Sequence, residues 1–522
     1  MASKSKLVNL DAMIKREDFA LDDGNLTASF DQVGTISVRD FGQAGFLAPS
    51  LRKPDFQRET NHWAPEQVCS LLECYVNGDL IPSVILWRSS TGIFVIDGGH
   101  RLSVLKAWVE DDYGDGPVSI SFFGHSLPSE QVKAAKLTRK LIADSIGSWQ
   151  HFQSRMTASD QTESEKIRTN TVASRGLAIQ WVNGNAEKAE RSFFHINTKG
   201  TPLDDLEELL LHNRKKPIAI AARAVIRSGM GHKYWSLFQE EKRRKIEEDA
   251  VKIHDILFSP EINSPIKTLD LPLGGSTGVR NGMKILMDFI MAANTHNNQP
   301  SAITTQTDDT DGAETLNCLK QTVKLAKRIT GNDSGSLGLH PAVYFYGPSG
   351  QHSSAMFMGF VTLIARKQSN NDDHFFVKFT KVRSRLEDIL IRNKDLISII
   401  LQRIISKKRV EKYTEILDST INQLYRDEPF SEQSLIAHAG LVGKVFVGSD
   451  SNAAEKFSDN TKSAAFIRNA LKSALKCPIC DGYLDPIRSV SYDHIIRVQD
   501  GGMGSSGNCD LTHPYCNQSV KN

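Results

Sequence analysis

Apolar residues near the N-terminus recur first with a helical period and then in short continuous runs. Between Pro65 and Tyr75 they are spaced three and four residues apart, which predicts a helix, and Pro65 suits its first turn. The runs 84–87 and 93–96 predict two strands joined by a turn, and a second helix is expected over 102–109. This region therefore reads as an α/β domain.

From about residue 205 to 440 the pattern is mostly helical and says little about chemistry. Helical spacing predicts helices over these segments: 206–212, 218–226, 381–404 and 406–425. The last two carry many lysines and arginines, which could follow a phosphate backbone, although charged helix faces are commonly just solvated. A polar stretch over 448–463 predicts a linker, and a last helix is expected over 464–475.

Composition narrows the class of protein. A chain of 522 residues is long enough for about three domains, and 40% hydrophobic with 24% charged residues is ordinary for a globular protein. The net charge of +2 means that any nucleic-acid-binding surface must be local. Seven cysteines, four of them in the tail, do not suggest a disulfide framework. The sequence shows no signal peptide or membrane-spanning run, so we expect a cytoplasmic protein without a membrane partner.

The tail carries two pairs of metal-binding residue types. They flank an insert long enough for two strands and a turn: Cys477 and Cys480, then His513 and Cys516. Three thiolates and an imidazole are a typical tetrahedral Zn²⁺ set. Cys509 competes with His513 as the fourth ligand, because His513 also lies one helical turn before Asn517, the spacing of a catalytic metal pair. A purely structural zinc knuckle is the simpler alternative.

Catalytic residue types lie between these two pairs. Asp493 and His494 are adjacent, followed by Gly501, Gly502 and Asn508. A histidine beside a carboxylate suits metal-assisted hydrolysis, because an imidazole can accept a proton near neutral pH. With these residues in this order between the two pairs of metal-binding residue types, the stretch from residue 477 onward resembles an HNH endonuclease domain.

The resemblance to HNH domains implies a ββα-metal fold and a role for each matching residue. His494 would be the general base, and Asp493 and Asn517 would hold the catalytic Mg²⁺ or Mn²⁺. Asn508 would brace the loop that aims the base, and Lys521 matches a basic residue often found after the motif. The implied substrate is DNA.

A second polar cluster lies at the expected junction between strand 93–96 and helix 102–109. A glycine-containing turn at a helix N-terminus presents free backbone N–H groups to an anion, and arginine suits bidentate phosphate contact. Taken alone, such a junction is equally consistent with an ordinary turn. The cluster consists of Asp97, Gly98, Gly99, His100 and Arg101.

Two further blocks accompany this cluster in order, at 55–58 with Trp63 and at 193–203. Together the three blocks, within residues 45–215, resemble the ParB-like family with Asp-Gly-Gln-(Gln or His)-Arg motifs. Its members include the N-terminal domains of GmrSD-type modification-dependent restriction enzymes and the DndB and SspE proteins associated with DNA phosphorothioation.

This second resemblance implies a module that binds or hydrolyses a nucleotide, ATP or GTP, and senses DNA. It adds four residues to the pocket of the Asp97 cluster: Gln57, Arg58, Asn197 and Lys199. The family usually has Gln where this chain has Gly99, so binding is implied more strongly than hydrolysis. Two plainer alternatives are that Arg58 pairs with Asp55 on the surface and that Trp63 belongs to the core.

The sequence thus predicts a multidomain α+β protein in five parts: 1–44, an N-terminal extension; 45–215, a ParB-like domain; 216–447, a helical middle domain; 448–463, a linker; and 464–522, an HNH domain. The expected function is a metal-dependent DNA endonuclease that restricts modified or foreign phage DNA, gated by its N-terminal domain. A non-enzymatic DNA-binding regulator with a zinc-knuckle tail and a nucleotidase targeted to DNA are the alternatives. The chain could act as a homo-oligomer or with a partner subunit.

Overall fold

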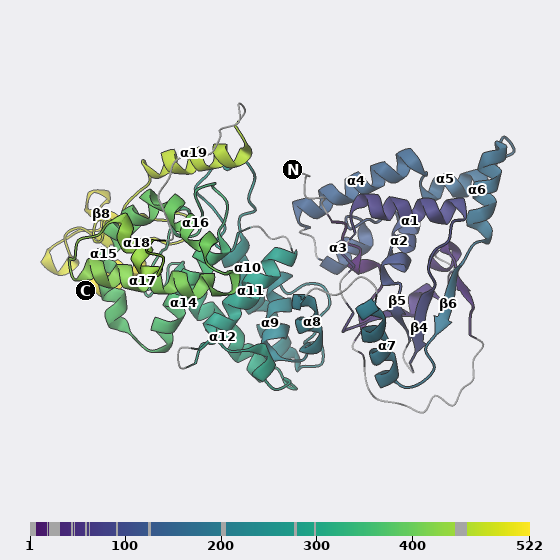
Figure 1. The fold of residues 1–522 in the computed structure, drawn as a ribbon, viewed down its shortest axis with the longest axis horizontal. Helices are drawn as coiled ribbons and strands as arrows, with labels where there is room; N and C mark the ends of the chain where they lie inside the picture. Colours follow the sequence, from purple (N-terminus) through teal and green to yellow (C-terminus); the bar gives the residue numbers. More distant parts are fainter. Residues whose placement is uncertain are drawn as a thin grey trace. The chain divides into compact units, whose positions relative to one another are not determined.

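The structure, a computed structural model, describes residues 7–17, 19, 32–42, 45, 47–57, 60–61, 63–89, 92–123, 127–199, 205–275, 279–296, 299–443 and 457–521. The chain forms two compact units (Figure 1). The N-terminal unit comprises Met1–Arg214 and Met230–Tyr234, and the C-terminal unit comprises Lys215–Gly229 and Trp235–Asn522.

The N-terminal unit is built on a mixed six-stranded sheet. In spatial order its strands are β1 (Arg16–Glu17), β3 (Leu51–Pro54), β5 (Ile93–Asp97), β4 (Val84–Arg88), β6 (Leu177–Trp181) and β2 (Thr35–Ile36). The β5–β4 and β6–β2 pairs are antiparallel and the other neighbours are parallel. The two strands predicted over 84–87 and 93–96 are β4 and β5.

Alternating side chains of β4 and β5 pack into two cores, one on each face of this sheet. Leu86 and Val95 belong to a large core to which several helices contribute, whereas Trp87 and Phe94 belong to a smaller aromatic core. The N-terminal unit has eight helices in its described part: α1 (Pro65–Asn77), α2 (Gly99–Glu110), α3 (Pro117–Phe123), α4 (Ser129–Ser145), α5 (Trp149–Met156), α6 (Glu163–Ser174), α7 (Ala186–Lys199) and α8 (Asp205–His212). Helices α1 and α2 pack on the large core and α7 on the small one, so the predicted α/β arrangement is confirmed for this region.

The C-terminal unit is mostly helical, as its apolar spacing predicts. Its helices are α9 (Pro217–Ile226), α10 (Glu240–Phe258), α11 (Val279–Ala293), α12 (Ala313–Ile329), α13 (Pro341–Tyr344), α14 (Ser354–Ser369), α15 (Asp373–Arg392), α16 (Lys394–Arg403), α17 (Arg409–Tyr425), α18 (Glu432–His438) and α19 (Asp459–Leu471). All ten residues of α9 are buried, so it is a core helix. The helix predicted over 381–404 is divided at Asn393 into α15 and α16.

The last segment of the chain packs into the C-terminal unit. It holds the antiparallel strands β7 (Ser491–His494) and β8 (Cys509–Thr512) and a short π-helical turn, η8 (Cys516–Val520). Tyr515 donates its N–H to the Ser336 carbonyl at 3.0 Å, and Arg488 pairs with Asp270 at 2.5 Å. Residues 444–456, which include 448–456 of the predicted linker, lie outside the described residues. Helix α19 begins at Asp459, five residues before the predicted start at 464, so the end of the predicted linker is helical.

Single-turn 3₁₀ helices complete the described elements: η1 (Asp11–Met13), η2 (Val38–Phe41), η3 (Ala48–Ser50), η4 (Ile303–Thr305), η5 (Ser406–Lys408), η6 (Val498–Asp500) and η7 (Ser506–Asn508). In the part of the chain that the structure describes, no helix combines the length and the apolar character needed to cross a bilayer.

Candidate functional site

The four predicted zinc ligands converge in the C-terminal unit. The ligand atoms of Cys477, Cys480, His513 and Cys516 all lie within 4.8 Å of one another. His513 Nδ1 is 3.4 Å from Cys480 Sγ and 3.8 Å from Cys516 Sγ. Bonds of about 2.3 Å to sulfur and about 2.0 Å to nitrogen place tetrahedral ligands about 3.6 Å apart, so this donor set fits Zn²⁺.

His513 is held in the form that binds a metal. Its Nε2 lies 3.0 Å from the Tyr483 carbonyl, and donation there leaves Nδ1 free to face the thiols. Burial lowers the pKa of His513, which keeps the imidazole neutral. The pKa of the Cys477 thiol is lowered by hydrogen bonds from neighbouring thiols, chiefly from Cys480. Cys477 therefore favours its thiolate form, which is the form that binds a metal.

The structure brings His513, and not Cys509, to the fourth ligand position. Cys509 is exposed on β8, directly opposite His494 of β7. His513 faces the thiols, whereas Asn517 donates from Nδ2 to Ser491 Oγ at 2.8 Å, so the two side chains contact different partners.

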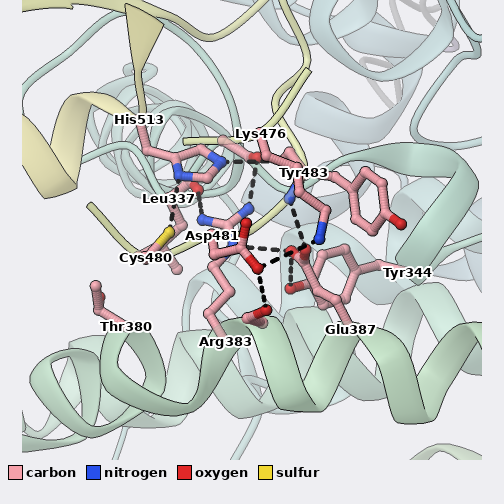
Figure 2. A network of polar contacts seen from close by, with 12 residues as sticks. Leu337, Tyr344, Thr380, Arg383, Glu387, Lys476, Cys480, Asp481, Tyr483 and His513 are labelled. Carbon is pink, nitrogen blue, oxygen red and sulfur yellow. Dashed lines mark hydrogen bonds and ion pairs between the residues drawn. The ribbon is translucent and has the colours of Figure 1, made fainter. Parts of the chain in front are cut away.

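A buried ion pair on α15 lies next to Cys480 and His513 (Figure 2). Arg383 donates from Nε to Glu387 Oε1 at 2.8 Å and from its two Nη atoms to the carbonyls of Leu337 and Gly338. Both side chains are at most 2% exposed. A buried guanidinium is tolerated only when its charge is paired and its N–H groups have acceptors. Here Glu387 pairs with the charge, and the two carbonyls accept hydrogen bonds from the Nη atoms.

The same ion pair holds the loop between Cys480 and Leu484. Glu387 Oε2 accepts the N–H of Tyr483 at 2.6 Å, and Oε1 accepts the hydroxyl of Tyr344 at 2.7 Å. A Cβ at Gly482 would lie 2.6 Å from Arg383 Nε, so only glycine allows this approach. Sequence reasoning missed this contribution, since the i,i+4 spacing of Arg383 and Glu387 resembles an ordinary solvated pair.

The β7–β8 hairpin carries the predicted catalytic residues. His494 ends β7 with an exposed side chain, and Asp493 before it is half-buried on the other face of the strand. Lys521 donates from Nζ to Asp493 Oδ2 at 2.6 Å and to the His494 carbonyl at 2.5 Å. Asp493 and His494 thus lie on the hairpin, and Asn517 lies in the turn η8 that follows β8.

Asn508 ties together the loop that connects the two strands. Its Oδ1 accepts the N–H of Ile496 at 2.7 Å, and its Nδ2 donates to the carbonyls of Ile496 and Met503. A Cβ at Gly502 would overlap the Ile496 carbonyl, so the turn requires glycine there. The loop that begins next to His494 is thus fixed at both ends.

The predicted anion-binding cluster of the N-terminal unit lies where β5 leads into α2. Asp97 Oδ2 binds Arg101 Nη2 at 2.5 Å, and Arg101 also donates to the Ser83 carbonyl at 3.2 Å. Gly98 has φ +94°, and a Cβ there would lie 2.6 Å from Val84 Cγ1. Both constraints make glycine obligatory at this turn.

Gln57 meets this cluster from the loop after β3. Its side chain is buried, its Nε2 donates to the Val95 carbonyl at 3.2 Å, and its Oε1 lies 3.2 Å from where a Gly99 Cβ would be. The His100 ring stacks on Trp63 with centroids 5.4 Å apart, and Trp63 packs against the large core, in line with the core alternative.

The structure does not describe the side chains of the other three predicted pocket residues. Arg58 lies outside the described residues, and so do the side chains of Asn197 and Lys199, whose backbone forms the end of α7. Asp55, the alternative partner of Arg58, binds Arg214 Nε at 2.8 Å.

Comparison with known proteins shows a similarity for one part of the chain, within the N-terminal unit. Residues 41–214 match the family model for the N-terminal domain of the GmrSD restriction endonuclease, which covers about a third of the chain. No curated protein and no solved structure matches the chain. The predicted resemblance of residues 45–215 to GmrSD-type domains is thus confirmed, whereas the wider ParB-like grouping and the HNH assignment of the tail stay predictions.

Proposed function

We propose that this protein is a metal-dependent DNA endonuclease of HNH type that restricts modified or foreign phage DNA. The observation that carries the proposal is that exposed His494 and half-buried Asp493 are neighbours at the end of β7. The β7–β8 hairpin that holds them is flanked in sequence by the two halves of a Cys₃His group. The match of residues 41–214 to a restriction endonuclease domain supports DNA as the substrate.

In this proposal the residues of the hairpin divide the work of phosphodiester hydrolysis. The exposed His494 imidazole accepts the proton of the attacking water. Asp493 and Asn517 supply hard oxygen donors suited to Mg²⁺ or Mn²⁺, and the Lys521 ammonium against Asp493 marks a position that favours a cation. When bound, the divalent ion supplies positive charge to the scissile phosphate. Asn508 keeps the loop after His494 in place.

Zn²⁺ has a structural role in this account. The hairpin segment has a small apolar core of its own, centred on Cys477, Leu484 and Cys516, two of which are proposed metal ligands. Small domains with so little core need a staple, and four ligands drawn from both ends of the segment provide one. The metal would thus fix the frame on which β7 and β8 present the catalytic residues.

The N-terminal unit is proposed to bind ATP or GTP, or the DNA backbone, and thereby gate cleavage. The glycine turn at the start of α2 offers backbone N–H groups to an anion, and Arg101 adds a guanidinium that Asp97 holds in place. Gln57, packed against Gly99, supplies a buried amide beside the same turn.

Plasmid cleavage tests the proposal. Wild-type protein should cleave DNA only with Mg²⁺ or Mn²⁺, and Asp493→Asn should remove cleavage while leaving zinc content and DNA binding intact. Phosphate release that depends on Asp97, with no cleavage in any metal, would instead indicate a nucleotidase. DNA binding without cleavage or phosphate release would indicate a regulator.

Gating is tested separately. Nucleotide should change the cleavage rate of wild-type protein, and Asp97→Ala should abolish that response. Cleavage that ignores both nucleotide and Asp97→Ala would refute gating while leaving the endonuclease assignment in place.

A further inference from the structure

The Asp493 carboxylate is already engaged by a cation from its own chain. Lys521 Nζ lies 2.6 Å from Asp493 Oδ2, and the side chains are 23% and 12% exposed. The same ammonium donates to the His494 carbonyl at 2.5 Å. One lysine therefore contacts the proposed metal ligand and the backbone of the proposed base.

The surroundings of Asp493 explain why a cation is held there. Asp510 of β8 lies directly opposite Asp493 in the antiparallel pair, so the two carboxylates share one face of the hairpin. Both residues are half-buried. Like charges directly opposite each other destabilise a sheet unless a cation intervenes, and the Lys521 ammonium offsets part of that repulsion.

Lysine is suited to a reversible occupation of this position. Its ammonium is a point charge on a flexible four-carbon stem, so it can withdraw without any backbone movement. Arg497 donates to the Lys521 carbonyl, so a contact independent of the ammonium anchors the backbone there. Asn517 donates to Ser491 and the Tyr492 carbonyl, contacts that do not depend on Lys521.

We propose that Lys521 is a place-holding cation: its ammonium occupies the Asp493 carboxylate while no divalent ion is bound and leaves when one binds. The inference rests on the proposed function in that Asp493 is taken as a ligand of the catalytic ion. Lys521 then competes with the divalent ion, so removing its charge must tighten divalent-ion binding.

Mn²⁺ titration of the zinc-loaded protein, followed by the electron paramagnetic resonance signal of free Mn²⁺, measures this competition without any cleavage. Lys521→Gln should lower the Kd for Mn²⁺ about fivefold, because it removes a partly exposed ion pair and a nearby positive charge. Lys521→Arg keeps the charge and should bind Mn²⁺ as wild type does. Lys462→Gln is the matched control, since Lys462 pairs with Asp459 on α19, away from the hairpin.

The outcomes separate this inference from the proposed function. Equal or weaker Mn²⁺ binding by Lys521→Gln, with binding abolished by Asp493→Asn, refutes the place-holder and preserves the metal site. Tightening by both Lys521→Gln and Lys521→Arg also refutes it, since charge would not be the cause. Mn²⁺ binding that ignores Asp493→Asn, or no binding at all, overturns the inference together with the proposed metal ligand.

Discussion

Glu387 on helix α15 accepts the N–H of Tyr483 at 2.6 Å, and the carbonyl of the same Tyr483 lies 3.0 Å from His513 Nε2. A carboxylate of the helical body thus holds the residue that orients a proposed zinc ligand (Figure 2). Groups that orient metal ligands commonly contribute to metal affinity, so we expect zinc binding and the folding of the C-terminal unit to be coupled.

Arg383→Met should strongly destabilise the C-terminal unit. The change leaves Glu387 without its buried partner, and breaking a buried pair from one side costs about 3–5 kcal/mol. Zinc affinity should also fall by about 10- to 100-fold, because the loop that holds Tyr483 loses its support. Urea unfolding and zinc capture by a chromogenic chelator measure the two effects.

Arg385→Met is the matched control on the same helix. Arg385 pairs with Asp427 at 2.7 Å, but both side chains are largely exposed. Its loss should cost less than about 1 kcal/mol and leave zinc affinity unchanged. Equal effects of the two substitutions would contradict the role given to the buried pair.

Zinc content should distinguish the ligand cysteines from the exposed one. Cys480→Ser should lose the bound metal, since a hydroxyl is a poor zinc ligand, whereas Cys509→Ser should retain it because Cys509 lies outside the ligand group. Elemental analysis of the purified variants gives the stoichiometry. Loss of zinc in Cys509→Ser would show that the fourth ligand is misassigned.

Stability should fall with decreasing pH through buried His340. Its Nδ1 accepts the N–H of Ala342 at the start of α13, and burial lowers the pKa of His340 to about 4. The folded pKa lies below the unfolded value of about 6.5, so stability is fully present above about pH 6.5 and falls by about 1.4 kcal/mol per pH unit toward pH 4.

His340→Asn keeps a side-chain oxygen for the helix cap but removes the titration. The pH dependence of the unfolding free energy between about pH 6.5 and pH 4.5 should therefore become shallower by the contribution of one histidine. His352 is also buried, with its pKa lowered to about 4, so part of the slope should persist. An unchanged slope would mean that His340 is not kept neutral in the folded protein.

Gly98→Ala should destabilise the N-terminal unit and weaken any binding at the start of α2. The residue has φ +94°, and the added methyl group would meet the Val84 side chain at 2.6 Å. Strain at such a position costs about 1–3 kcal/mol. Gly34→Ala, with no atom within 4 Å of its Cβ, is the control. Thermal unfolding should shift only for Gly98→Ala.

The sequence predicts those features of the fold and of the candidate site that depend on residues close together in the chain. The Cys-x-x-Cys and His-x-x-Cys spacings bring each ligand pair together without reference to the rest of the chain. The continuous apolar runs of β4 and β5 reflect two buried faces. The Gly98-Gly99 pair likewise indicates a turn between β5 and α2, whereas the positive φ of Gly98 and its contact with Val84 are seen only in the structure.

Tertiary features escape such reasoning. Nothing in the spacing of Arg383 and Glu387 shows that the pair is buried, because burial depends on the distant segments that cover it. The break between α15 and α16 at Asn393 is hidden as well: apolar spacing continues across it, while the Asn393 side chain bonds to the Ile389 carbonyl. The opposition of Asp493 and Asp510 requires the strand register.

Cleavage of plasmid DNA by wild-type and His494→Ala protein, each with Mn²⁺ and full zinc content, tests the central claim most directly. The variant should lose at least about 100-fold in cleavage rate while its DNA affinity and unfolding midpoint stay unchanged, because only the general base is removed. Full cleavage by His494→Ala would contradict the account and place the catalytic residues elsewhere in the chain.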